Sequence, residues 1–158
     1  EAFNLANSFS RDPQDWLVLV GPTGCGKTHL AVAIAAVQIA LGKRPFFAFV
    51  PELLDHLRYT FNPASPVAYD RLFEEIKNTP LLILDDFGSE STTPWAAEKL
   101  YQIIVQRHNA RLPTVITSRY YEQGLNPAIQ SRLNDVSLVG LINMNNVPDY
   151  RNSGRSTE

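Results

Sequence analysis

The sequence has one cysteine, no long apolar run and almost no net charge, and each absence excludes a class of protein. With Cys25 alone the chain can form no internal disulfide, which is typical of proteins from a reducing compartment. No apolar stretch approaches the roughly 18 residues that a membrane-spanning helix needs. The N-terminus lacks the basic start and apolar core of a signal peptide. We therefore expect a cytoplasmic protein that makes no membrane contact.

The charge balance limits how the protein could meet nucleic acid. The chain has 14 Lys and Arg residues against 16 Asp and Glu, for a formal net charge of −2. Without an overall basic surface, nucleic acid would have to bind at a local patch or across an assembly of copies. No repeat, low-complexity segment or linker divides the 158 residues. We expect one domain over 1–151, followed by a disordered tail over 152–158.

The most informative stretch is the glycine-rich loop at 21–28, Gly-Pro-Thr-Gly-Cys-Gly-Lys-Thr. It fits G-x-x-x-x-G-K-[ST], the phosphate-binding loop of P-loop NTPases. Glycines allow successive backbone N–H groups to point into one concavity and hold phosphate oxygens. Lys27 adds a positive charge toward the β- and γ-phosphates, and Thr28 supplies a hydroxyl for Mg²⁺. The alternative is a glycine-rich turn that matches the pattern by chance.

The flanking residues favour the functional interpretation. An apolar run at 16–20 predicts a buried strand before the loop. The Ala- and Leu-rich run at 29–41 predicts a helix after it, with Gly42 as the residue that ends the helix. Cys25 is either a small packing residue of the loop or a redox sensor. The expected nucleotide-binding residues are those of the loop and the next residue: Gly21, Pro22, Thr23, Gly24, Cys25, Gly26, Lys27, Thr28 and His29.

A second informative stretch is an apolar run that ends in two acids, Leu-Leu-Ile-Leu-Asp-Asp at 81–86. Open α/β sheets bind ligands at the carboxyl ends of their strands, where this Walker B pattern places both carboxylates. Asp85 is expected to hold Mg²⁺. Asp86 could polarise the water that attacks the phosphate. Alternatively, the two acids only cap the next loop.

The remaining elements alternate between strands and helices, which predicts an α/β fold with a mainly parallel, five-stranded sheet. Thr93 and Pro94 read as the N-cap and first residue of a helix that runs to about Asn109. The other expected elements are a short amphipathic helix within 1–15, a strand at 45–50, a helix from Pro51, a turn at 59–66, a helix at 67–77, a strand at 113–118, a short helix at 126–133 and a strand at 136–142.

Four blocks occur together: Trp-Leu-Val-Leu-Val-Gly-Pro-Thr-Gly-Cys-Gly-Lys-Thr-His-Leu at 16–30, Leu-Leu-Ile-Leu-Asp-Asp-Phe-Gly at 81–88, Pro-Thr-Val-Ile-Thr-Ser at 113–118 and Ile-Gln-Ser-Arg-Leu at 129–133. The combination resembles the AAA+ ATPases of the bacterial helicase-loader group, DnaC and DnaI, with the transposition helper IstB beside them. The resemblance implies a three-layer α/β/α sandwich whose lid domain is absent or vestigial. It also implies ATP and Mg²⁺ as ligands, and a homo-oligomer that acts on single-stranded DNA and a replicative helicase. We expect the helicase contact to need an N-terminal domain that this sequence lacks.

The resemblance assigns three arginines. Arg132 matches the arginine finger, which would act on ATP held by a neighbouring subunit; the alternative is a surface arginine that caps its helix. Arg151 resembles the sensor-2 arginine that contacts nucleotide in its own subunit, unless it belongs to a disordered tail. Arg119 stands where the family usually carries an Asn that orients the lytic water. An arginine cannot accept a hydrogen bond from water but can bind the γ-phosphate. The expected catalytic residues are thus Lys27, Asp86, Arg119 and Arg132.

The helical segment after the second strand lies where the group carries an inserted helix that touches single-stranded DNA. His56, Arg58, Tyr59 and Phe61 are the candidates here, because they offer a cation, a titratable ring and two stacking surfaces. The alternative places Tyr59 and Phe61 in the core and His56 on a solvated face.

Three classes of function therefore stay open. The leading one is an ATP-dependent helicase loader, with an IstB-type transposition ATPase as its variant. A metabolite kinase shares the phosphate loop, but the sequence lacks the arginine-rich lid that kinases carry. An ATP-gated scaffold with little hydrolysis is suggested by Arg119. The choice of ATP over GTP depends on the resemblance and on the lack of an Asn-Lys-x-Asp guanine motif.

Overall fold

Five strands form one parallel sheet with the order β2-β3-β4-β1-β5. The computed structural model describes residues 2–61, 63–64, 67–88, 93–119 and 125–151. The strands are β1 (Trp16–Val20), β2 (Phe46–Phe49), β3 (Leu82–Phe87), β4 (Thr114–Ser118) and β5 (Val139–Asn143). Because all of them run in the same direction, their carboxyl ends meet at one edge of the sheet. The predicted α/β class and the five-stranded sheet are confirmed.

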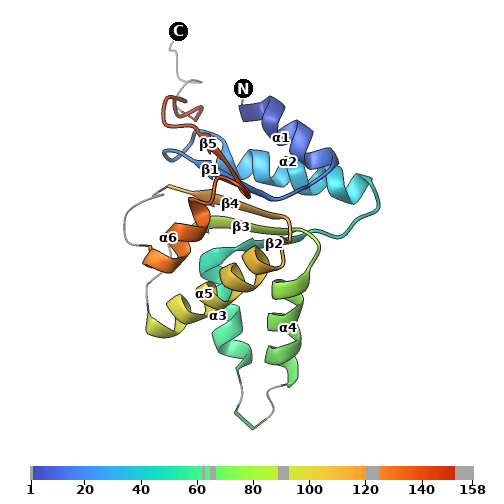
Figure 1. The fold of residues 1–158 in the computed structure, drawn as a ribbon, viewed down its shortest axis with the longest axis vertical. Coiled ribbons are helices and arrows are strands. Elements are labelled where there is room, and N and C mark those ends of the chain that lie inside the picture. The colour runs from blue at the N-terminus through green and yellow to red at the C-terminus, as the bar shows by residue number, and fades with distance from the viewer. Residues whose placement is uncertain (1, 62, 65–66, 89–92, 120–124, 152–158) are drawn as a thin grey trace.

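Helices cover both faces of the sheet (Figure 1). They are α1 (Ala2–Arg11), α2 (Lys27–Ala40), α3 (Val50–Thr60), α4 (Val67–Asn78), α5 (Pro94–Asn109) and α6 (Pro127–Leu133). Helices α1 and α2 pack on one face, over a cluster that includes Leu17, Leu19 and Ile34. The other four cover the opposite face, over a larger cluster that includes Val18, Leu84 and Ile104. This is the predicted three-layer sandwich, and no helix follows β5 within 144–151, where a lid would begin.

Local signals in the sequence explain several helix ends. Thr93 caps α5 as predicted, since its Oγ1 accepts the Ala96 N–H at 3.2 Å and Pro94 follows it. Gly42 adopts a φ of 76° after α2, and its N–H donates to the Ile39 carbonyl at 2.9 Å. Among the described residues, no helix has the length and apolar character that crossing a membrane requires.

Two predicted boundaries were wrong. The last strand starts at Val139 and not at Val136, because Asp135 forms a turn with the residues between. The Asp135 carbonyl accepts hydrogen bonds from the N–H groups of Leu138 and Val139 at 3.0 and 2.8 Å. Val136 lies in this turn and is 94% exposed. Helix α3 continues to Thr60, so Tyr59 lies in a helix and not in the expected turn.

A buried arginine joins the far ends of the strands. Arg107 of α5 is fully buried, and burial lowers the pKa of its guanidinium to about 10. The group stays charged at neutral pH and donates hydrogen bonds to Thr114 Oγ1 and to the carbonyls of Ile76, Lys77, Thr79 and Pro113. These contacts connect α4, α5 and β4 at the edge of the sheet opposite the carboxyl ends of the strands.

Candidate functional site

The phosphate loop lies between β1 and α2, at the carboxyl edge of the sheet. Gly24 and Gly26 have φ values of 81° and 98°, which few residues other than glycine adopt. Gly26 immediately precedes α2 and supplies no capping side chain. The first N–H groups of α2 therefore remain available to an anion, at the positive end of the helix.

Lys27 lies on the inner side of this loop. Its side chain is largely buried, and Nζ donates to the carbonyls of Gly21 and Pro22, both at 2.7 Å. Cys25 Sγ is 3.7 Å from the same Nζ, and Cys25 is 5% exposed. The burial of Cys25 favours its interpretation as a packing residue of the loop.

Asp85 is the centre of a network of oxygen atoms. Thr28 Oγ1 donates to its two carboxylate oxygens at 3.0 and 3.2 Å, and Thr117 Oγ1 donates to Oδ1 at 2.6 Å. Asp85 is 5% exposed, so these hydroxyls stabilise a carboxylate that is almost removed from water. A hydroxyl beside a carboxylate suits Mg²⁺, which prefers oxygen ligands. The described residues contain no cluster of three or more His, Cys, Asp or Glu side chains that could hold a metal, so water and phosphate would supply the remaining ligands.

Asp86 points in a different direction because its backbone is strained. Its φ of 58° is unusual for a residue other than glycine, and its N–H donates to Thr117 Oγ1 at 2.9 Å. Its carboxylate faces Arg119, whose Nε and Nη2 lie 3.3 Å from Oδ1 and Oδ2 respectively. Arg119 thus contacts the residue that we expected to polarise water, a contact that sequence reasoning missed.

A cavity of about 200 Å³ brings together eight of the residues predicted for the nucleotide site. Thr23, Gly24, Lys27, Thr28, Asp85, Asp86, Arg119 and Arg151 line it. Phe49 and Thr117 line it as well, and sequence reasoning assigned a role to neither. The position of Thr117 at the carboxyl end of a strand next to β3 was the signal that could have identified it.

A larger cavity of about 610 Å³ adjoins the loop on its other side. It is mainly apolar and is formed by the start of α1, the start of α2 and residues from the segment 143–150. The lining residues are Ala2, Phe3, Cys25, Gly26, His29, Leu30, Asn143, Met144, Val147 and Tyr150. Its size and apolar walls suit a flat aromatic ring such as a nucleobase. The sequence alone did not indicate this cavity, because residues far apart in the chain contribute to it.

Arg132 lines neither cavity. Its Nη1 donates to the Ala128 carbonyl of its own helix at 2.9 Å, and its guanidinium lies over the Tyr101 ring at 5.9 Å. Its Nε is buried and finds no hydrogen-bond partner among the described residues. Arg132 is therefore not assembled with the phosphate loop of its own chain, and its role on a neighbour stays a prediction.

The candidate DNA-binding residues lie at the end of α3, away from the loop. Tyr59 is 90% exposed, so the alternative that placed it in the core was wrong. Phe61 is half-exposed and meets the Tyr69 ring edge-on at 5.3 Å. Arg58 lies 5.3 Å over the Trp95 ring, and His56 is on the solvated face.

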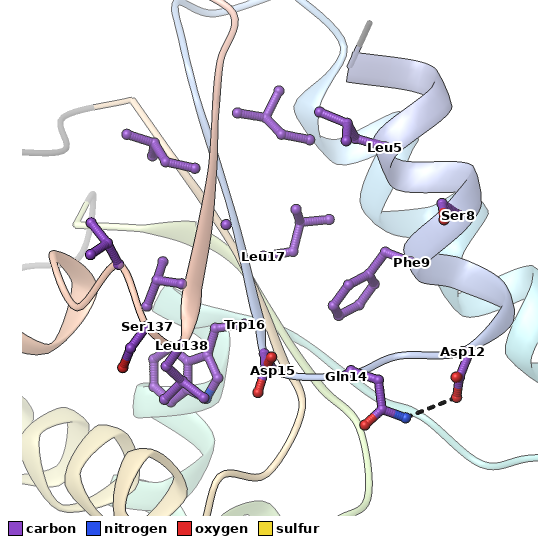
Figure 2. Close-up of a pocket in the computed structure, with 15 residues that line it drawn as sticks. Leu5, Ser8, Phe9, Asp12, Gln14, Asp15, Trp16, Leu17, Ser137 and Leu138 are labelled. Atoms are coloured by element: carbon purple, nitrogen blue, oxygen red, sulfur yellow. Dashed lines mark hydrogen bonds between the residues drawn. The ribbon is translucent and has the colours of Figure 1, made fainter.

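A third hollow, shown in Figure 2, lies between α1 and the sheet edge formed by β1 and β5. Leu5 and Phe9 of α1 face it from one side, and Asp12 and Gln14 form a hydrogen bond of 2.9 Å at one end. It contains none of the predicted site residues.

Known proteins show the same combination of loop and sheet. The replicative helicase loader DnaC of Buchnera aphidicola subsp. Baizongia pistaciae (strain Bp) is 27% identical over 135 residues, which are 85% of this chain and 54% of that protein. An insertion sequence IS5376 ATP-binding protein from Geobacillus stearothermophilus is 33% identical over 107 residues, 68% of this chain and 41% of that protein. The chain thus spans about half the length of the curated relatives it matches.

A crystal structure of the DnaC helicase loader superposes with a TM-score of 0.76 at 28% identity, over 90% of this chain and 87% of that one. The family model of the IstB-like ATP binding protein matches residues 4–127, which include the phosphate loop and both acids of β3. The chain has the AAA+ P-loop fold that the sequence predicted. It therefore belongs to the IstB-like ATP-binding protein family.

Proposed function

We propose that this chain is the ATP-binding and ATP-hydrolysing AAA+ module of a DNA replication helicase loader. The convergence of Lys27, Thr28, Asp85 and Asp86 on one cavity carries this proposal. Such a cavity offers a cation, a hydroxyl and two carboxylates to a triphosphate, beside a helix N-terminus that attracts its charge. The proposal extends the ATP binding of the family to a reaction and a cellular role.

Different residues of the chain bind the phosphates, the Mg²⁺ ion and the base. Backbone N–H groups of the loop and of the first turn of α2 bind the phosphates, and Lys27 exchanges its contacts with the Gly21 and Pro22 carbonyls for phosphate oxygens. Thr28 and Asp85 would hold Mg²⁺, which supplies positive charge to the phosphates when it is bound. The larger cavity takes the base between the start of α1, His29 and Tyr150.

Hydrolysis is in-line attack of water on the γ-phosphate. Asp86 orients the water once its carboxylate is released from Arg119, and Arg119 then moves to the γ-phosphate. Arg132 completes the site from the next subunit and stabilises the charge of the transferred phosphoryl group. Turnover is consequently slow in an isolated chain and increases on assembly.

The loader role draws on the relatives and on α3. DnaC relatives are named replicative helicase loaders, and we assign the same partner class to the whole protein that contains this chain. Single-stranded DNA would stack on Tyr59 and pair with Arg58, which lie together at the end of α3. A homo-oligomer would supply several such sites along one strand.

A transposition ATPase is the second candidate. Two comparisons favour it. The family model describes an IstB-like ATP binding protein, and one relative is named as the ATP-binding protein of an insertion sequence. An ATP-gated scaffold is the third candidate, and the contact of Arg119 with Asp86 favours it.

The first experiment measures ATP turnover per chain against protein concentration, with and without single-stranded DNA. Turnover that rises with concentration and responds to DNA supports the oligomeric ATPase. The Lys27→Ala variant should bind no nucleotide and serves as the blank. Tight ATP binding with flat, negligible turnover at every concentration would overturn the ATPase in favour of the scaffold. Tyr59→Ala should weaken single-strand binding about tenfold, and unchanged binding would remove α3 from the DNA surface.

A further inference from the structure

The last described residues of the chain return to the phosphate loop. After β5 the chain turns at Met144, whose carbonyl accepts the Val147 N–H at 3.0 Å. Residues 147–151, which we call the strap, then meet the loop between β1 and α2. The Tyr150 N–H donates to the Gly24 carbonyl at 3.2 Å. Figure 1 shows the chain leaving β5 at the same end of the sheet as this loop.

Asp149 of the strap makes the closest contact with the loop. The Asp149 carboxylate packs against Gly24 so tightly that a Cβ on Gly24 would overlap the carboxylate oxygens. Gly24 is therefore glycine for two reasons, its φ of 81° and this contact. The carboxylate accepts the Arg151 N–H at 2.9 Å and makes no salt bridge with any described residue. A carboxylate thus lies against a loop whose backbone is shaped to bind anions.

The rest of the strap forms walls of both cavities. Val147 and Tyr150 line the larger one, and Arg151 lines the smaller one beside Lys27 and Thr28. Tyr150 also meets the His29 ring edge-on at 5.2 Å, which fixes the strap to the first turn of α2. The strap therefore contributes to both cavities through the adjacent residues Tyr150 and Arg151, and Asp149 immediately precedes them.

We propose that Asp149 sets the affinity of this site for nucleotide, because its carboxylate lies against Gly24, a residue that lines the phosphate cavity, and repels a triphosphate bound there. The inference depends on the proposed nucleotide site. Like charges within a few ångströms repel across a partly buried surface, so phosphate binding and the Asp149–Gly24 contact oppose each other. Arg151, two residues along, is attracted by the same phosphates and pulls the strap in the other direction.

A purely structural role for Asp149 makes a different prediction. An aspartate that only forms the turn with the Arg151 N–H could be replaced by asparagine, whose side-chain oxygen accepts the same bond. Such a replacement would leave nucleotide affinity unchanged at every salt concentration. The charge-based role predicts a gain in affinity that salt reduces.

The test compares the full chain with its Asp149→Asn variant by calorimetric titration with ATP and Mg²⁺. We expect the variant to bind about tenfold more tightly at low salt, and the gain to shrink toward twofold at about 0.5 M salt. Asp70→Asn, on the exposed part of α4, makes the same change in net charge far from the loop and should bind like the original chain. Lys27→Ala added to Asp149→Asn should abolish binding, which ties the gain to this loop.

A second measurement follows the strap itself. Hydrogen exchange of the Tyr150 amide, which is bonded to Gly24, should become at least about tenfold faster when ATP is added to the original chain. Equal or weaker ATP binding by Asp149→Asn, or an unchanged exchange rate at Tyr150, would overturn the role of Asp149 while leaving the nucleotide site intact. Failure of both proteins to bind ATP would overturn the strap and the proposed function together.

Discussion

Arg119 contacts both carboxylate oxygens of Asp86, with its Nε and Nη2 each at 3.3 Å. The two side chains are 38% and 22% exposed, so solvent screens the pair and its strength is about 1 kcal/mol. The strained φ of Asp86 turns its carboxylate toward Arg119. In the proposed reaction, Arg119 thus competes with water for the carboxylate of Asp86.

The first prediction concerns this competition. Arg119→Asn removes the fork and places at this position an amide that can hydrogen-bond to water. We expect turnover per chain to rise about fivefold, because about 1 kcal/mol of competing interaction is lost while the asparagine amide can donate to the γ-phosphate in place of Arg119. Steady-state kinetics with a parallel measurement of the ATP dissociation constant checks it. Arg119→Lys keeps the positive charge but not the two-pronged guanidinium. Its turnover should lie between those of the original chain and of Arg119→Asn. A fall in turnover together with weaker ATP binding would instead identify Arg119 as a phosphate ligand only.

The second prediction concerns the arginine finger. Arg132→Ala should leave ATP binding within about twofold and reduce concentration-dependent turnover by about 10³-fold, because no charge then reaches the neighbouring γ-phosphate. Turnover measured across protein concentrations checks it, with Arg71→Ala on the exposed face of α4 as the matched control. If the turnover per chain of Arg132→Ala still rises with protein concentration, another residue is the arginine finger.

The third prediction concerns the stability of the sheet. Arg107→Leu should lower the free energy of unfolding by about 3–5 kcal/mol, since the carbonyls of Ile76, Thr79 and Pro113 lose a charged donor in a buried setting. Urea unfolding monitored by circular dichroism measures this. Arg111→Leu, on the exposed turn that follows α5, should change stability by less than about 0.5 kcal/mol. Similar losses in both variants would show that the buried hydrogen bonds contribute little.

The fourth prediction concerns pH. The Ser137 hydroxyl and N–H, together with the His108 ring at 3.0 Å, hold the pKa of Asp135 below its usual value. A carboxyl group whose pKa is lowered by folding stabilises the native state above its unfolded pKa of about 3.9. That contribution is lost as the pH falls through the lower folded value. The free energy of unfolding of Asp135→Asn should therefore lie below that of the original chain at pH values well above about 3.9 and converge with it as the pH falls through the lowered folded pKa. A gap that persists to the lowest pH would assign the effect to shape and not to charge.

Sequence reasoning predicted the parts of the site that come from short, local patterns. The loop at 21–28 and the acids at 85–86 are each defined by adjacent residues, and both lie where a parallel sheet collects its strand ends. The caps at Thr93 and Gly42 were predictable for the same reason. A backbone conformation that a few neighbouring residues specify can be read from their order alone.

Tertiary structure alone decided the contacts between segments that are distant in the chain. The Arg119–Asp86 pair joins residues 33 positions apart, and the Asp149 contact brings the end of the chain to a loop 125 residues earlier. The larger cavity likewise needs α1, α2 and the strap together. No periodicity or motif in the sequence predicts these contacts. They depend on the strand order β2-β3-β4-β1-β5, which places β1 between β4 and β5. The sequence by itself determined the phosphate loop and the two acids of β3, and the packing of the sheet decided which charged residues lie against them.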